Sequence, residues 1–195
     1  MNIEINLMNF FEKQVSCIED IKKKKGSIKE IIELLIYARN QKKRIFIMGN
    51  GGSGSTASHF CSDLLKTAII KKQKRFQAFS LVDNIPVILA WSNDVSYDSV
   101  FVEQLKNFLT KDDILIGFSG SGNSKNIINA FEYGKKIGAV CIGFTGVTGG
   151  LMKKYCKICI RVNSDDMLTI EAQHVIIFHG IVETVRKMGD PLFKY

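Results

Sequence analysis

The chain has 195 residues, of which 46% are hydrophobic and 24% are charged, and its net charge is +8. This balance is typical of one ordinary globular domain, and no apolar run approaches the roughly 20 residues that a membrane span requires. The first residues include early acids and lack a basic start followed by an apolar run, so we expect a cytoplasmic protein without a secretory signal or a membrane partner.

The positive charge gathers in two lysine-rich runs, at residues 22–25 and 71–75. Such runs are usually solvated helix ends or loops. Neither a nucleic-acid-binding module nor interleaved aromatic residues accompany them, so nucleic acid is not an expected partner. An anionic substrate explains the surplus of positive charge equally well.

Two amphipathic helices are predicted first, at residues 3–23 and 27–41, and Ser27 with Glu30 suggests a capping box at the start of the second. One side of the first helix carries apolar residues at helical spacing, namely Met8, Phe11, Val15 and Ile18. This face must be buried against its own domain or against a second copy. The pattern therefore favours a homo-oligomer.

After residue 42, short apolar runs alternate with helical segments. We expect strands at 44–48, 76–81, 113–118, 139–144 and 157–162. Helices are expected near 55–70, 97–109, 124–137, 149–155 and 168–188. Near-continuous apolar strands between helices predict a parallel sheet that is covered on both faces. We therefore expect an α/β fold, a doubly wound single domain over residues 1–195, with helices at 1–41 and an α/β core at 42–195.

Glycine and serine are concentrated at two strand-to-helix junctions, residues 49–55 and 119–124. In doubly wound sheets, ligands bind beyond the carboxyl ends of the strands, where such loops lead into helix N-termini. Glycines allow the backbone to approach a ligand closely, and the serines add hydroxyl groups beside the helix dipole. The two loops together predict an anion site, most simply for a phosphate group.

The first loop also matches the pattern G-x-G-x-x-G through Gly49, Gly51 and Gly54. A dinucleotide site would need an acidic residue about 20 positions further on, where this chain has the basic run at 71–75. Neither loop contains the G-K-[ST] of a Walker P-loop. We therefore expect no nucleotide cofactor.

Three motifs together resemble the SIS (sugar isomerase) domain family, and within it the phosphoheptose isomerases. They are GNGGS at 49–53, SGSGNS at 119–124 after DILIGF, and E-x-x-H-x-x-x-x-H at 171–179. The resemblance covers nearly the whole chain, including WSND at 91–94. It implies a five-stranded, flavodoxin-like parallel sheet and a homotetramer with active sites shared between subunits. It also implies isomerisation of sedoheptulose 7-phosphate to D-glycero-D-manno-heptose 7-phosphate through an enediol.

The resemblance assigns roles to individual residues. Asp63 would be the catalytic base and His179 the acid. Zinc, which some members bind, would be held by His59, Asp63, Glu171 and His179. The substrate and its phosphate would be bound by Asn50, Gly51, Gly52, Ser53, Ser119, Ser121 and Ser124. Asn93 and Asp94, after a predicted strand, are candidates for substrate hydroxyls, with a polar turn as the alternative.

Two positions depart from the family pattern, because the family's Glu is Asp63 here and its Gln is Glu171. Aspartate keeps the carboxylate but has a shorter reach, whereas Glu171 adds a negative charge. His59 and Asp63 are four residues apart and should share one helix face. Glu171 and His179 are eight apart, about 12 Å along a helix, so one ion between them needs side chains that lean together or ligands from two subunits. His174, on an apolar helix, is expected in the core or behind the site.

Two other functions stay open at this point, and a third is disfavoured. The chain could be a non-catalytic SIS protein that senses a phosphosugar or binds a partner such as a replication initiator. It could also isomerise another ketose phosphate, whereas the missing acidic residue disfavours NAD-dependent chemistry. Convergence of Asp63 and His179 would distinguish an enzyme from a binding module, since only an enzyme needs the pair.

Overall fold

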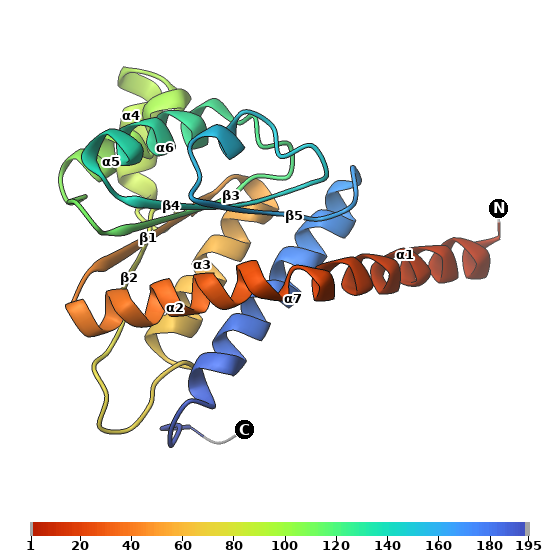
Figure 1. Cartoon of the computed structure of the whole chain (residues 1–195). Helices are drawn as coiled ribbons and strands as arrows, with labels where there is room; N and C mark the ends of the chain where they lie inside the picture. The colour runs from red at the N-terminus through yellow and green to blue at the C-terminus, as the bar shows by residue number, and fades with distance from the viewer. Residues whose placement is uncertain (1, 194–195) are drawn as a thin grey trace.

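A computed structural model describes residues 2–193 and shows a five-stranded, all-parallel sheet with the order β2-β1-β3-β4-β5 (Figure 1). The strands are β1 (Arg44–Gly49), β2 (Gln77–Ser80), β3 (Ile114–Phe118), β4 (Val140–Thr145) and β5 (Ile158–Arg161). Each lies where the sequence predicted a strand, and the doubly wound α/β fold is confirmed. The strands are apolar because helices cover both faces of the sheet, and all five residues of β3 are buried.

Seven α-helices lie in the described part of the chain. They are α1 (Ile3–Lys23), α2 (Lys25–Gln41), α3 (Gly51–Leu65), α4 (Ile85–Asp94), α5 (Val102–Lys106), α6 (Lys125–Ile137) and α7 (Met167–Arg186). Helices α2, α3 and α7 cover one face of the sheet, and α4, α5 and α6 lie on the other (Figure 1). Within residues 2–193, no helix has the length and apolar character needed to cross a membrane.

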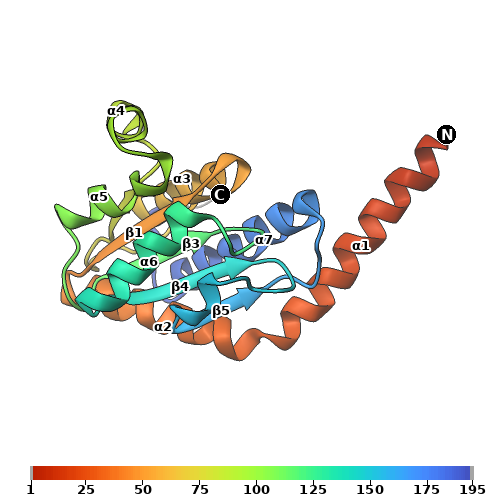
Figure 2. The same cartoon turned by 90° about the horizontal axis from the view of Figure 1, so that it is seen from above.

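Helix α1 extends away from the rest of the molecule at its N-terminal end (Figure 2). Its C-terminal part is attached to α7, where the side-chain amide of Gln14 donates to the Thr169 hydroxyl (3.0 Å) and its oxygen accepts from the Gln173 amide (2.9 Å). The predicted apolar side of α1 is exposed at Met8, Phe11 and Val15, which are each at least half accessible. This chain alone therefore does not bury that face.

Two predicted helix starts were wrong. Helix α2 begins at Lys25, with Lys24 as its N-cap, so Ser27 lies inside the first turn and forms no capping box. One residue is enough to separate α1 from α2, because the Lys24 N–H still bonds to the end of α1 while its carbonyl accepts from Ile28. Helix α3 begins at Gly51 instead of residue 55, so the glycines of the first loop form a helical turn.

The segment around WSND was also predicted wrongly, because it is the end of helix α4 and does not follow a strand. The start of α4 had a readable signal: the Asn84 side chain accepts from the N–H of Val87, and Pro86 stands in the first turn. Asn93 and Asp94 are exposed in the last turn and hydrogen-bond to each other (2.8 Å). The helices predicted at 97–109 and 149–155 are shorter, a 3₁₀ turn followed by α5 and a single 3₁₀ turn at Met152–Lys154.

His174 is a core residue, as one of the two predicted alternatives states. Its side chain is fully buried against the rings of Phe118 and Phe144, with centroid distances of 5.5 and 6.1 Å. Its Nε2 lies 3.4 Å from the carbonyl oxygen of Thr145. Burial lowers the pKa of His174 to about 4, and the contact with Thr145 offsets this only in part.

We predict that His174 makes the protein sensitive to acid. In the unfolded chain the pKa of His174 is about 6.5, whereas in the folded protein it is about 4. Between these two pH values the unfolded state binds a proton at His174 and the folded state does not. The free energy of unfolding should therefore fall as the pH drops through this window, with His174 contributing about 2 kcal/mol at pH 5. Urea unfolding at pH 7.5 and pH 5 measures the loss. A His174→Phe variant should lose less, and an equal loss in both proteins would contradict the assignment.

Candidate active site

The chain reverses its winding between β1 and β3, which are neighbours in the sheet. Strand β1 pairs with β2 on one side and with β3 on the other, and Gly49 is in register with Phe118. The loops that follow β1 and β3 therefore leave the same edge of the sheet toward opposite faces. This is the place where doubly wound proteins bind their ligands.

The glycines of the first loop allow β1 and α3 to pack closely. A Cβ atom on Gly49 would lie 2.2 Å from the carbonyl oxygen of Ser53, and one on Gly54 would lie 3.1 Å from the carbonyl oxygen of Gly49. Gly51 has a φ of +54°, in the left-handed region that favours glycine. Close strand-to-helix packing accounts for the G-x-G-x-x-G spacing without a nucleotide.

Two asparagines join the two loops. The Nδ2 of Asn50 donates to Oδ1 of Asn126, and the Nδ2 of Asn126 donates back to Oδ1 of Asn50, both at 2.9 Å. The hydroxyl of Tyr97 donates to the same Asn50 oxygen at 2.8 Å. Asn126 is buried and was not singled out from the sequence. The Asn50 amide, predicted to contact substrate, is thus engaged in holding α3 and α6 together.

The predicted phosphate serines lie around one small cavity. Its volume is about 120 Å³, well above the roughly 10–15 Å³ that one water molecule requires. The four serines that line it are Ser53, Ser119, Ser121 and Ser124. The hydroxyls of Ser119 and Ser124 are 3.2 Å apart. Asn50 and Ser124 are the N-cap residues of α3 and α6, and neither side chain forms a capping hydrogen bond with its own helix. Two helix N-termini and four hydroxyls therefore meet, a combination that favours an anion.

A second cavity of about 300 Å³ adjoins the first and shares Gly120, Ser121 and Met167 with it. Its remaining wall comes from the segments 146–148 and 164–165, together with Ile170. The sequence analysis did not single out these segments, although the first of them opens the glycine-rich stretch GVTGG at 146–150. Neither Asn93 nor Asp94 lines the two cavities, so their contact with substrate stays a prediction.

His59, Asp63 and His179 meet further along α3 and α7. The Nε2 atoms of the histidines are 3.5 Å apart, and they lie 3.9 Å (His59) and 3.6 Å (His179) from Oδ2 of Asp63. The other oxygen of Asp63 accepts from the hydroxyl of Thr67 at 2.9 Å, which fixes the carboxylate. Asp63 is largely buried, whereas the two histidine side chains are half exposed.

This group of three has the dimensions of a metal site. The three ligand atoms all lie within 4.8 Å of one another. A tetrahedral zinc ion with bonds of 2.0–2.2 Å requires ligand atoms about 3.3 Å apart, so small side-chain movements would complete the geometry. Imidazole nitrogen and carboxylate oxygen are ligands that zinc accepts, and the fourth position would stay open for a substrate oxygen. The residues present therefore fit a divalent cation.

Glu171, the fourth predicted ligand, is not part of this group. Its carboxylate lies two turns earlier on α7 and faces the start of α3. Its Oε1 is 3.4 Å from the hydroxyl of Ser53, and a Cβ atom on Gly52 would lie 2.3 Å from Oε2. The sequence placed Glu171 on the correct helix but could not show which end of the site its side chain would reach.

Comparisons with known proteins identify the family. The family model described as "SIS domain" matches residues 9–146. The phosphoheptose isomerase of Clostridium acetobutylicum is 36% identical over 188 residues, which cover 93% of this chain and 95% of the relative. That of Helicobacter pylori strain P12 is 34% identical over 160 residues, covering 82% and 83%.

Solved structures show the same fold. The phosphoheptose isomerase of Francisella tularensis superposes with a TM-score of 0.89 at 25% identity, over 96% of this chain and all of that one. The one from Neisseria gonorrhoeae, at 23% identity, has a TM-score of 0.88 over 95% of this chain and all of its own. The chain therefore belongs to the SIS domain family, and its curated relatives place it among the phosphoheptose isomerases.

Proposed function

We propose that this protein is an aldose–ketose isomerase that converts sedoheptulose 7-phosphate to D-glycero-D-manno-heptose 7-phosphate. The observation that carries the proposal is the convergence of Asp63 and His179 on helices whose first turns border the serine cavity. A protein that only binds a phosphosugar does not need such a carboxylate–imidazole pair. The curated relatives named phosphoheptose isomerase supply the choice of substrate.

The site has two ends. Ser53 and His59 are six residues apart on α3, which is about 9 Å along the helix. A ligand that contacts both ends must be an extended molecule of several carbons with an anionic group at one end. We assign the phosphate to Ser53, Ser119, Ser121 and Ser124 and the reacting carbons to Asp63 and His179. Binding at the phosphate end then orients the carbons at the other.

The reaction moves two protons. Asp63, as a carboxylate, would remove a proton from C1 of the ketose while His179 donates one to the oxygen on C2, which gives an enediol. His179 would then take the proton of the oxygen on C1, and Asp63 would return its proton to C2, which leaves the aldose. A divalent cation such as Zn²⁺, held by His59, Asp63 and His179, would polarise the substrate carbonyl in place of proton donation by His179, because a ring nitrogen that binds a cation carries no proton. Thr67 keeps the Asp63 carboxylate in place through its hydrogen bond.

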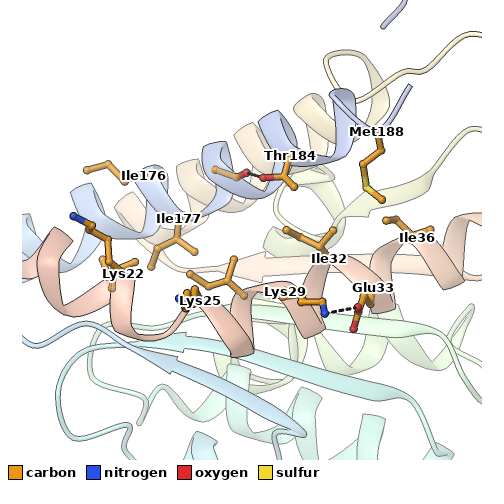
Figure 3. Close-up of a pocket in the computed structure, with 13 residues that line it drawn as sticks. Lys22, Lys25, Lys29, Ile32, Glu33, Ile36, Ile176, Ile177, Thr184 and Met188 are labelled. Atoms are coloured by element: carbon orange, nitrogen blue, oxygen red, sulfur yellow. Dashed lines mark hydrogen bonds and ion pairs between the residues drawn. The ribbon is translucent and has the colours of Figure 1, made fainter. Parts of the chain in front are cut away.

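The oligomer that we propose is a homotetramer. The exposed side of α1 that carries Met8, Phe11 and Val15 is one unpartnered apolar surface, and a groove between α2 and α7 is a second (Figure 3). The groove has a volume of about 550 Å³, and Ile32, Ile36 and Ile176 are among the apolar residues that line it. Two separate apolar surfaces, each pairing with the same surface of another copy, would give a tetramer of dihedral symmetry. A second copy would also cover the half-exposed histidines and exclude water from the reaction.

The proposed reaction predicts turnover of the ketose phosphate. The purified protein, with and without added Zn²⁺, should exchange the C1 proton of sedoheptulose 7-phosphate and should do so faster than with ketose phosphates of five or six carbons. Asp63→Asn should lower kcat by about 10²–10⁴-fold, because removing a general base has that effect. Asp112→Asn, at a half-exposed turn residue whose carboxylate faces Lys43, is the matched control and should retain activity. Absence of turnover under both metal conditions would contradict the proposed function.

The proposed tetramer predicts the mass of the protein in solution. Light scattering coupled to size exclusion should give a mass near four times the 21.9 kDa of the chain. Replacing Phe11 and Val15 by Asp should lower this mass, because charges would enter the apolar face of α1. Asn6→Asp adds a charge to the opposite side of the same helix and should leave the tetramer intact. A monomeric wild-type protein, or a tetramer that survives the double substitution, would rule this assembly out.

A further inference from the structure

Glu171 occupies space that Gly52 leaves free. The carboxylate oxygens would lie only 2.3 and 2.6 Å from a Cβ atom at position 52, so this contact exists because Gly52 has no side chain. Oε1 is 3.4 Å from the hydroxyl of Ser53. A carboxylate from α7 thus rests directly on the first turn of α3.

The first turn of α3 has no anion of its own. It contains no acidic residue, and its N-cap side chain, Asn50, is bonded to Asn126 and Tyr97 instead of to the helix. A helix N-terminus carries a partial positive charge and free N–H groups, which an anion stabilises. Glu171 supplies the negative charge that the local sequence lacks.

Ser53 belongs to two environments at once. Its hydroxyl contacts Glu171, and Ser53 also lines the same cavity as Ser119, Ser121 and Ser124. A phosphate in that cavity would bring a second negative charge to the same hydroxyl and the same helix end. The Glu171 carboxylate and the phosphate, both close to the Ser53 hydroxyl, would repel each other strongly where water is partly excluded.

We propose that Glu171 is an internal competitor of the substrate phosphate, one that neutralises the start of α3 in the empty site and moves away when an anion binds. The proposal rests on the proposed function in one respect, namely that the serine cavity binds the phosphate. Glu171 then lowers the affinity for anions and favours release of the phosphorylated product. It is a positioning residue of the binding loop and takes no part in proton transfer.

The test is the binding of inorganic phosphate to the full-length protein, measured by calorimetry in wild type and in Glu171→Gln. The amide keeps the size of the side chain but removes its charge, so we expect phosphate to bind about tenfold more tightly. Glu183→Gln makes the same change three turns further along α7, where the carboxylate pairs with Lys187, and should stay within twofold of wild type. Glu171→Asp retains the charge with a shorter reach and should bind phosphate no more than threefold more tightly.

Thermal unfolding gives an independent readout. Without phosphate, Glu171→Gln should melt below wild type, because α3 loses its neutralising charge. Saturating phosphate should raise its Tm by more than that of wild type. Equal or weaker phosphate binding by Glu171→Gln, or no binding by either protein, would overturn the proposal. Turnover of sedoheptulose 7-phosphate by the wild type tests the proposed function separately, because its absence leaves the phosphate result intact.

Discussion

The site depends first on the pairing of β1 with β3. Because the chain places β2 and β3 on opposite sides of β1, the helices that follow β1 and β3 start beside each other and run to opposite faces of the sheet. The reciprocal amide pair of Asn50 and Asn126 then fixes the distance between the two helix starts. With Asn126 buried, loss of either partner would leave polar groups without hydrogen bonds, so the pair holds the serine cavity in one shape.

A second constraint is the packing of α3 alongside α7. The two helices run in the same sense, with Ser53 facing Glu171 at one end and His59 facing His179 at the other. The ring of Phe178 on α7 stacks on Phe60 of α3 at a centroid distance of 5.2 Å and contacts His59 edge-on at 5.0 Å. These aromatic contacts restrict the position of the His59 ring. The anion end and the proton-transfer end are therefore parts of one pair of helices, and binding at one end orients the other.

The sequence predicted what depends on local pattern. The five strands follow from apolar runs, and the meeting of His59 with Asp63 follows from their spacing of four. Other features depend on contacts between distant segments. Asn126 was missed because one asparagine in a helix has no distinctive pattern, and its partner is 76 residues away. Helix α4 was missed because its apolar run lacks a helical period, although Asn84 and Pro86 marked its start.

Glu171 illustrates why a charge cannot be assigned from its position in the sequence alone. The same carboxylate could face the histidines or the phosphate loop, and the choice depends on which end offers it more favourable electrostatics. The empty loop offers an unneutralised helix end and a space beside Gly52, whereas the histidine end already has the carboxylate of Asp63. A group that stabilises the empty site in this way necessarily opposes its anionic ligand. Such a site gives up ground-state affinity, and weaker binding of the phosphate does not by itself slow the chemical step at Asp63 and His179.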